Sequence, residues 1–290
     1  MTRFFFILAF TFANLVIAEE NHPEKENSFP DGSTVPLALK THVLQLMPRG
    51  SINVFLAVEF KQEWEAPVSR LRGDLIRLGM LRFDFYISKY VSVKITGVVQ
   101  EFLRIHGNPD LGQYDIQSNT AHDIGDVSIA TVACIIPPKK HRPALGFRIE
   151  TKLPNTNQDR GLGPNTTDIT ISTLAAHRAG PVLVFGDMGI GILTAPRNLN
   201  EQNDVLVYGL GAIWRINRTL QLAWEANGFL STRPTIPAGT EDRGNVRFGL
   251  VWTFPKWTIE LFPAYGLTKR EGKFSLLVGL SWRLNIHTHG

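Results

Sequence analysis

The feature that most constrains the fold is a repeated alternation of apolar and polar residues across positions 51–284. In Phe274–Leu284 every even position is apolar, whereas the odd positions include Ser275, Ser281 and Arg283. Side chains of a β-strand point to opposite faces in turn, so such a segment has one apolar and one polar face. No helical period of similar regularity is present. The pattern therefore predicts an all-β chain.

About twelve segments of this kind follow one another, each roughly ten residues long. They are Ile52–Phe60, Leu75–Ile87, Val91–Phe102, Val127–Ile135, Phe147–Leu153, Thr167–Ala175, Val182–Ile192, Val205–Trp214, Leu220–Leu230, Val246–Phe254, Trp257–Leu267 and Phe274–Leu284. The alternation is weakest in Val127–Ile135, where Val132 and Cys134 fall on the side expected to be polar. The strand count is therefore open by about two, mainly around Asp123–Arg142.

The connections between these segments alternate between short and long. The short ones are Ser88–Tyr90, Pro137–Arg142, Arg178–Gly180, Asn217–Arg218 and Pro255–Lys256, and the long ones are His106–His122, Pro154–Pro164, Thr194–Asn203 and Ser231–Gly244. Short periplasmic turns and long external loops are typical of outer-membrane barrels. We therefore expect an antiparallel transmembrane up-and-down β-barrel of about twelve strands, spanning residues 51–284.

Tryptophan placement favours the same fold. Five tryptophans lie near strand ends or on the apolar face, where a membrane–water interface accommodates both the ring and its N–H: Trp214, Trp224, Trp252, Trp257 and Trp282. The alternative is a soluble periplasmic β-rich binding protein with an ordinary tryptophan core. In a soluble protein, other parts of the chain would have to cover the apolar faces of four consecutive strands.

Residues 1–18 have the features of a secretory signal peptide. Arg3 precedes the apolar run Phe4–Ile17, which is shorter than the ~20 residues of a membrane-spanning helix. Small residues suited to cleavage end at Ala18, so we expect a mature chain from Glu19. The expected location is the outer membrane of a Gram-negative bacterium, with its lipids and the barrel-assembly machinery as partners.

The two ends of the chain differ from the barrel. Residues 19–50 contain Pro23, Pro30, Pro36 and Pro48 among many polar residues, and we expect a periplasmic arm without regular structure. Residues 285–290 form a polar tail. The formal net charge of +4 includes Arg3 of the signal peptide, so the positive bias is too weak to indicate a nucleic-acid partner. A single cysteine rules out an internal disulfide.

The polar faces of the last four strands carry charges of both signs. By parity Glu225, Arg247, Glu260 and Arg283 point into the lumen and form a connected network. Further lumen-facing candidates are Glu59, Arg82, Asp84, Lys94, Arg148, Glu150, Lys152, Asp168 and Asp187. One interpretation is a charged lining that screens solutes. The favoured interpretation is an ion-pair ladder that plugs and rigidifies the lumen, and the two are compatible.

Enzymatic function is not expected. The eight histidines fall mostly in loops and tails. By parity His177 lies on the outer face, away from a lumenal Ser172, so no nucleophile–base pair forms. Gly161–Pro164 and Gly189–Gly191 lack the Lys-Ser/Thr of a phosphate loop. His287 and His289 are interpreted as part of a solvated tail, and no metal or cofactor is expected.

Several short motifs resemble one family. The strand Leu145–Pro154 with its Lys-Leu-Pro corner, followed by 161–168, resembles the "MetA-pathway of phenol degradation" family of outer-membrane transporters. Leu46–Ser51 and Ile124–Val127 are similar to the same family, and the resemblance spans about residues 41–284. It implies a barrel that passes hydrophobic or aromatic compounds. The chain departs from the usual terminal aromatic of such barrels, since Trp282 is followed by Arg283, Leu284 and the polar tail.

Twelve strands lie between the filled interior of eight-stranded barrels and the aqueous channel of porins, so the bore should be narrow. We expect a porin-like passive conduit for small, weakly polar or aromatic compounds. The alternative is a structural barrel, or one that binds through the loops His106–His122 and Ser231–Gly244.

Overall fold

The computed structural model describes residues 35–112, 114–116, 119–196 and 201–285. The expected signal peptide, the first part of the expected arm (19–34) and the tail residues 286–290, with His287 and His289, lie outside the described residues.

The described chain is built almost wholly of strands. The strands are β1 (Ser51–Glu65), β2 (Arg72–Tyr86), β3 (Val91–Ile105), β4 (Thr120–Asp123), β5 (Val127–Ile136), β6 (Ala144–Leu153), β7 (Asp168–Ala179), β8 (Val182–Thr194), β9 (Gln202–Arg215), β10 (Leu220–Ser231), β11 (Arg243–Thr253), β12 (Trp257–Gly266) and β13 (Phe274–Asn285). One 3₁₀ turn, η1 (Gln158–Arg160), lies between β6 and β7. None of the helices among the described residues has the length and apolar character needed to span a membrane.

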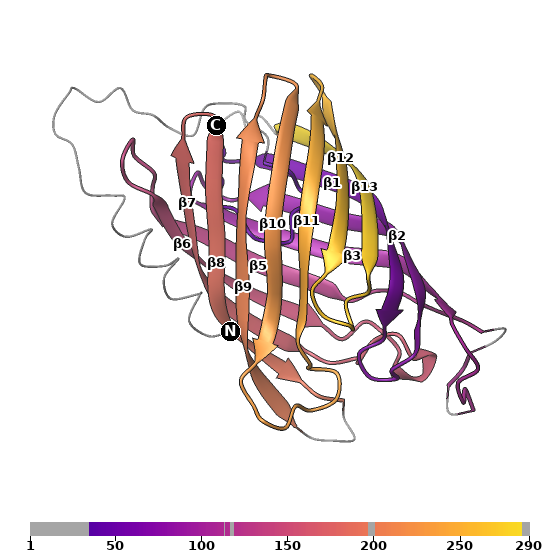
Figure 1. Cartoon of the computed structure of the whole chain (residues 1–290). Helices are drawn as coiled ribbons and strands as arrows, with labels where there is room; N and C mark the ends of the chain where they lie inside the picture. The colour runs from indigo at the N-terminus through magenta and orange to yellow at the C-terminus, as the bar shows by residue number, and fades with distance from the viewer. Residues whose placement is uncertain (1–34, 113, 117–118, 197–200, 286–290) are drawn as a thin grey trace.

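These strands close into one barrel (Figure 1). Neighbours along the chain pair antiparallel, and β1 closes the ring against β13 with Ser51 opposite Asn285. β4 and β5 both pair with β3. Asp123 belongs to the β4 pairing and Ala130 to the β5 pairing, so β4 and β5 are two parts of one interrupted strand. The barrel therefore has twelve strands, and the predicted fold class is confirmed.

The interruption between β4 and β5 has a local cause. Gly125 lies between the two pieces and donates its N–H to the carbonyl oxygen of Val98 at 3.0 Å. A Cβ at Gly125 would lie 2.6 Å from the Val98 Cβ, so the backbones approach too closely for another residue. This position lies within 123–142, where the sequence left the strand count open.

The connections at one rim are mostly shorter than those at the other, as expected from the sequence, and 137–143 is the exception. Both ends of the barrel, Ser51 and Asn285, share one rim with the short connections 87–90, 137–143, 180–181, 216–219 and 254–256. We call this rim the short-turn end. The opposite rim, the long-loop end, carries 66–71, 106–119, 154–167, 195–201, 232–242 and 267–273.

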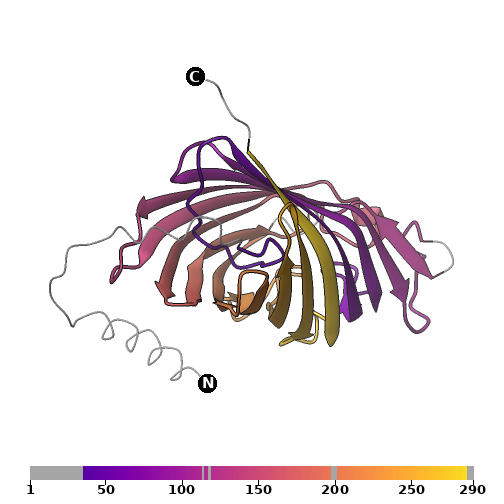
Figure 2. The same ribbon diagram turned by 90° about the horizontal axis from the view of Figure 1, so that it is seen from above.

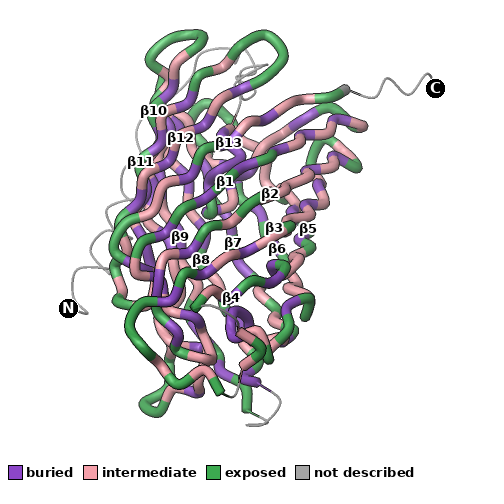
Figure 3. Tube along the Cα trace, turned by 90° about the vertical axis from the view of Figure 1, so that its right-hand side faces the viewer, coloured by how far each residue is buried: buried purple, intermediate pink, exposed green. Residues whose placement is uncertain are grey.

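The outer surface of the barrel is apolar. Buried and exposed residues alternate along the strands (Figure 3). The exposed apolar side chains come from all around the ring, and include Val58, Ile149, Ile190, Phe248 and Val278. A closed barrel with such an outer face satisfies its backbone internally and presents mainly apolar side chains to lipid.

A β-bulge reverses the side-chain parity of β2. Ala57 lies opposite Met80, whereas Glu59 lies opposite Arg77, so β2 has one extra residue there. Gly79 at this position has a φ of 65°. Odd residues such as Arg77 therefore face the lumen on one side of the bulge, and even residues such as Arg82 face it on the other. Simple alternation along β2 misses this change.

Residues 35–50, which we call the plug segment, lie inside the ring of strands (Figure 2). They have no regular secondary structure, as expected, but they occupy the lumen rather than the periplasm. Leu37, Leu39, Val43 and Leu44 are buried in one apolar cluster with lumen-facing residues of the wall. That cluster includes Val132, which explains the weak alternation of β5. The expected arm enters the barrel because its apolar side chains are buried there.

Candidate functional site in the barrel lumen

Glu260 of β12 holds the first part of the plug segment. Its carboxylate is fully buried and accepts hydrogen bonds from the backbone N–H groups of Leu37 (3.1 Å) and Ala38 (2.7 Å). The Ser281 hydroxyl donates to the same carboxylate at 2.9 Å. A buried carboxylate needs such donors, and an irregular segment without a neighbouring strand needs acceptors.

Glu225 of β10 repeats this arrangement one step along the plug segment. It accepts from the N–H groups of Lys40 (3.0 Å) and Thr41 (2.8 Å). The Arg247 guanidinium of β11 donates to Glu225 at 3.0 Å and to the Ala38 carbonyl at 2.6 Å. The ion pair Glu225–Arg247 thus lies directly against the plug backbone.

The four charges predicted to form a network are therefore arranged unevenly. Glu225 and Arg247 pair, and Glu260 joins them through the plug segment, at Ala38. Arg283 is opposite Asn53 near the short-turn end, and its Nε has no hydrogen-bond partner among the described residues. The structure brings three of the four together and leaves Arg283 apart.

Arg82 and Asp84 of β2 anchor the other side of the plug segment. The Arg82 guanidinium binds the Asp84 carboxylate through two hydrogen bonds of 2.9 and 3.0 Å. It also donates to the carbonyls of Leu37 (2.9 Å) and Leu39 (3.2 Å). Lys94 of β3 lies 3.8 Å from Asp84, beyond hydrogen-bond distance.

A third cluster surrounds His42 of the plug segment. The ring Nε2 of His42 lies 3.3 Å from the Glu150 carboxylate of β6. The backbone N–H of His42 donates to the Asp187 carboxylate of β8 at 3.4 Å. Arg148 binds Glu150 and also donates to Ser172 at 2.8 Å. Burial, reinforced by the Arg148 charge, lowers the pKa of His42 to about 3. His42 is therefore neutral at physiological pH.

The remaining predicted lumen charges lie toward the long-loop end. Lys152 binds Asp168 at 2.8 Å and Asp126 at 3.1 Å. Glu59 pairs with Arg77 at 3.1 Å, and Arg77 also binds Glu101 at 2.6 Å.

Some charged residues of the lumen were not among the sequence candidates. Arg77 lies beyond the β2 bulge, where the parity of the rest of β2 fails, and Glu101 is opposite it on β3. Lys61 of β1 binds Glu271 of the loop 267–273 at 2.5 Å, and Lys40 of the plug segment lies 3.4 Å from the same carboxylate. Lys61 shares the parity of Glu59 and could have been found from it. A loop residue such as Glu271 carries no periodic signal.

The long-loop end is covered by its own loops. Arg270 binds Glu65, and Arg70 binds Glu241, which joins three connections across the rim. Trp64 is buried in an apolar cluster with residues of the loops 106–119 and 154–167.

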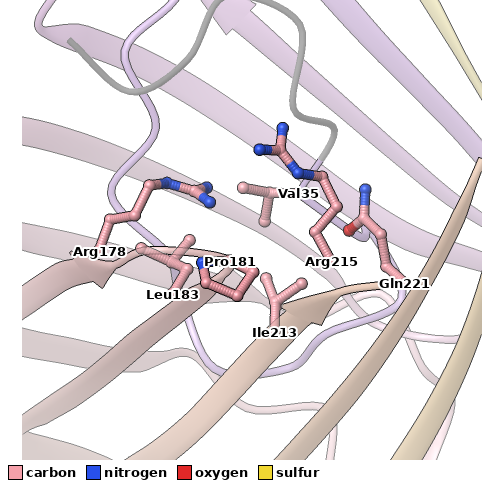
Figure 4. Close-up of a pocket in the computed structure, with 7 residues that line it drawn as sticks. All are labelled: Val35, Arg178, Pro181, Leu183, Ile213, Arg215 and Gln221. Carbon is pink, nitrogen blue, oxygen red and sulfur yellow. The ribbon is translucent and has the colours of Figure 1, made fainter. Parts of the chain in front are cut away.

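Val35, the first described residue of the plug segment, lies in a small pocket at the short-turn end. Val35 lies between Arg178 and Arg215, with Leu183 and Ile213 beside it (Figure 4). Pro181 and Gln221 complete this pocket. Val35 therefore closes part of this rim.

One larger cavity of about 260 Å³ remains between the plug segment and the wall. Its apolar lining includes Leu37, Leu39, Phe55, Met80 and Leu277. Its polar lining includes His42, Arg82, Lys94, Thr96, Asp126, Ser128 and Glu150. The cavity is thus amphipathic, with β1, β2, β13 and the plug supplying most of the apolar side.

The described residues contain no cluster of three or more histidine, cysteine or carboxylate side chains suited to a metal ion. Ser172 is engaged by Arg148 in the lumen, whereas His177 has the opposite parity on β7.

No family model and no curated protein match this chain. The family resemblance drawn from the sequence motifs therefore remains a prediction. The fold itself defines the class, a closed twelve-stranded antiparallel β-barrel like those of bacterial outer-membrane proteins.

Solved structures with similar architecture are only distantly related. The translocator domain of the autotransporter NalP from Neisseria meningitidis is 12% identical, with 81% of this chain and 88% of that chain covered and a TM-score of 0.49. The Ralstonia pickettii toluene transporter TbuX is 12% identical over 84% of this chain and 91% of that one, with a TM-score of 0.43. The outer membrane channel DcaP of Acinetobacter baumannii is 10% identical over 80% and 72%, with a TM-score of 0.34. Similarity at this level does not assign a function.

Proposed function

We propose that this chain is an outer-membrane β-barrel through which small, weakly polar or aromatic compounds diffuse passively. The observation that carries the proposal is the amphipathic cavity of about 260 Å³ between the plug segment and the wall. Pockets for small molecules are mostly apolar, with a few polar groups that orient the ligand. The route runs beside the plug segment, along β1, β2 and β3.

The outer-membrane location follows from the same physical argument as the fold. An apolar belt around a closed barrel is unfavourable in water and suited to lipid. The expected partners are outer-membrane lipids and the barrel-assembly machinery. Fractionation and heat-modifiability on a gel test this location. Recovery of the protein as a soluble periplasmic monomer without detergent would instead favour the β-rich binding protein.

Liposome swelling tests the conduit. Proteoliposomes should swell in nicotinamide, a weakly polar one-ring compound, and not in sucrose, which is bulky and polar. Met80→Trp should slow the nicotinamide response several-fold, because Met80 lines the cavity. Met188→Trp is the matched control, since Met188 is 61% exposed on the outer face. No swelling in either solute, with a folded barrel, would refute the conduit.

The second candidate is a structural or loop-binding barrel without transport. Two ion pairs at the long-loop end favour it because they link the loops there to one another and to β1: Arg70–Glu241 and Arg270–Glu65. It predicts a folded, heat-modifiable barrel that is impermeable to both solutes. The swelling experiment therefore separates the two candidates directly.

A further inference from the structure

Among the charged groups that line the cavity, Lys94 has the most distant ion-pair partner. Its side chain is 4% exposed and lines the cavity. Asp84, at 3.8 Å, is the one carboxylate within ion-pair distance in the described chain, and Arg82 already binds it through two hydrogen bonds. An ammonium group has three donors, and the described residues provide Lys94 with no hydrogen-bond acceptor.

The other charged groups that line the cavity each have an ion pair of 3.4 Å or less, including Lys40, which lies 3.4 Å from Glu271. Among lining residues, Glu150 binds Arg148 and His42, and Asp126 binds Lys152 at 3.1 Å. Arg247 is similarly paired with Glu225. Lys94 is therefore the charged group of the lining that has no hydrogen bond and no ion pair shorter than 3.8 Å among the described residues. Burying an ammonium group without acceptors is costly, so an anion beside it would be favoured.

The rest of the cavity suits a compact apolar body. Phe55, Met80 and Leu277 lie on the wall, and Leu37 and Leu39 on the plug segment. An apolar cavity of about 150 Å³ can hold benzene. A cavity of about 260 Å³ therefore has room for one ring and a small head group.

We propose that this cavity is a binding site for small monocarboxylates with a compact apolar body, in which the carboxylate pairs with Lys94. The inference rests on the proposed function, because it names the class of compound that the route would accept. Its consequence for transport is selectivity. A one-ring carboxylate should bind better than an uncharged or cationic compound of the same size.

Calorimetric titration of the full-length barrel in lipid nanodiscs tests the site. Benzoate should bind at one saturable site, and benzyl alcohol and benzylammonium should bind at least tenfold more weakly. Lys94→Met keeps the length of the side chain and removes its charge, so benzoate affinity should fall at least tenfold. Lys139→Met is the matched control, because Lys139 is an exposed lysine in the connection 137–143, outside the cavity.

Three results would overturn the inference: no saturable benzoate binding to the folded wild type, unchanged affinity in Lys94→Met, or a preference for benzylammonium. If Lys94→Met is no longer heat-modifiable, and so is not folded, the comparison of benzoate, benzyl alcohol and benzylammonium on wild type decides the question. Binding without liposome permeability would refute the conduit and keep the site. Permeability without saturable binding would keep the conduit and refute the site.

Discussion

Buried carboxylates of the wall act as acceptors for the backbone of the plug segment. Glu260 and Glu225 each accept two N–H groups, a role that strand neighbours usually fill. Arg82 and Arg247 provide the matching donors to plug carbonyls. Charges in this lumen therefore bind both each other and the main chain.

Arg247→Ala should strongly destabilise the barrel. The side chain is 1% exposed, and its removal leaves Glu225 without its ion pair and the Ala38 carbonyl without its donor. Breaking a buried pair typically costs about 3–5 kcal/mol. Urea unfolding in lipid measures the loss, with the outward Leu250→Ala as control. Equal, small losses in both variants would contradict the role of the pair.

Acid should weaken the barrel through His42. The pKa of His42 falls from a usual value of 6.5 to about 3 in the folded chain, mainly because of burial and the Arg148 charge. The Lys94 charge also lowers this pKa, whereas Glu150 raises it. Below pH 6.5 the unfolded chain binds a proton that the folded chain does not, so stability is lost as pH falls toward 3.

The measurement is urea unfolding at pH 7.5 and pH 4.5. The acid-induced loss should be about 2–3 kcal/mol larger in wild type than in His42→Gln, which cannot titrate. Asp187 also faces this site and is present in both proteins, so its contribution is common to both. An identical loss in the two proteins would contradict the assignment.

Among the elements, the plug segment is the one that simple periodicity could not place. It has neither strand nor helix period, and its proline and polar neighbours are typical of an exposed arm. Its signal was composition: Leu37, Leu39, Val43 and Leu44 are too apolar for a solvated arm. The strands were predictable because lipid imposes alternation on every one of them. The interruption at Gly125 and the bulge at Gly79 were not, because each depends on contact with a neighbouring strand.

Hydrogen exchange should show that the plug segment is held by the wall carboxylates. The amides of Leu37, Ala38, Lys40 and Thr41 should be protected in wild type, since each has a buried acceptor. A Glu225→Gln and Glu260→Gln double variant weakens these acceptors, so exchange there should accelerate at least tenfold.

Amides within the β7–β8 pair serve as the internal reference for that experiment. They should exchange equally slowly in both proteins, because their partners are unchanged. Fast exchange of the four plug amides in wild type would show that the segment is not seated in the lumen.

Gly79→Ala should destabilise the bulge of β2. The residue has a φ of 65°, and an added Cβ would lie 2.9 Å from Val99 Cγ2. The positive φ and the close contact with Val99 together should cost about 1–2 kcal/mol. Gly180→Ala is the matched control, with a φ of 58° and open space around the added Cβ, so it should lose less. Thermal unfolding in the same detergent compares them, and a Gly79 variant as stable as wild type would contradict the bulge.

At the scale of the whole molecule, the barrel is a closed wall around an occupied lumen. Its outside is largely apolar, its inside carries ion pairs and an apolar cluster, and the plug segment forms part of the cavity lining. Twelve strands leave room for both a plug and a narrow route, whereas eight would leave room for side chains alone. The conductance should therefore be small and should depend on how firmly the wall holds the plug segment.

Single-channel recording in planar bilayers measures how far the plug segment fills the lumen. Wild type should show small, steady steps, well below those of an open sixteen-stranded porin, because the lumen is largely filled. The Glu225→Gln and Glu260→Gln double variant should raise the conductance several-fold by loosening the plug segment, whereas Leu250→Ala should leave it unchanged. A wide, porin-like conductance in wild type, or the same conductance in wild type and the double variant, would contradict the account.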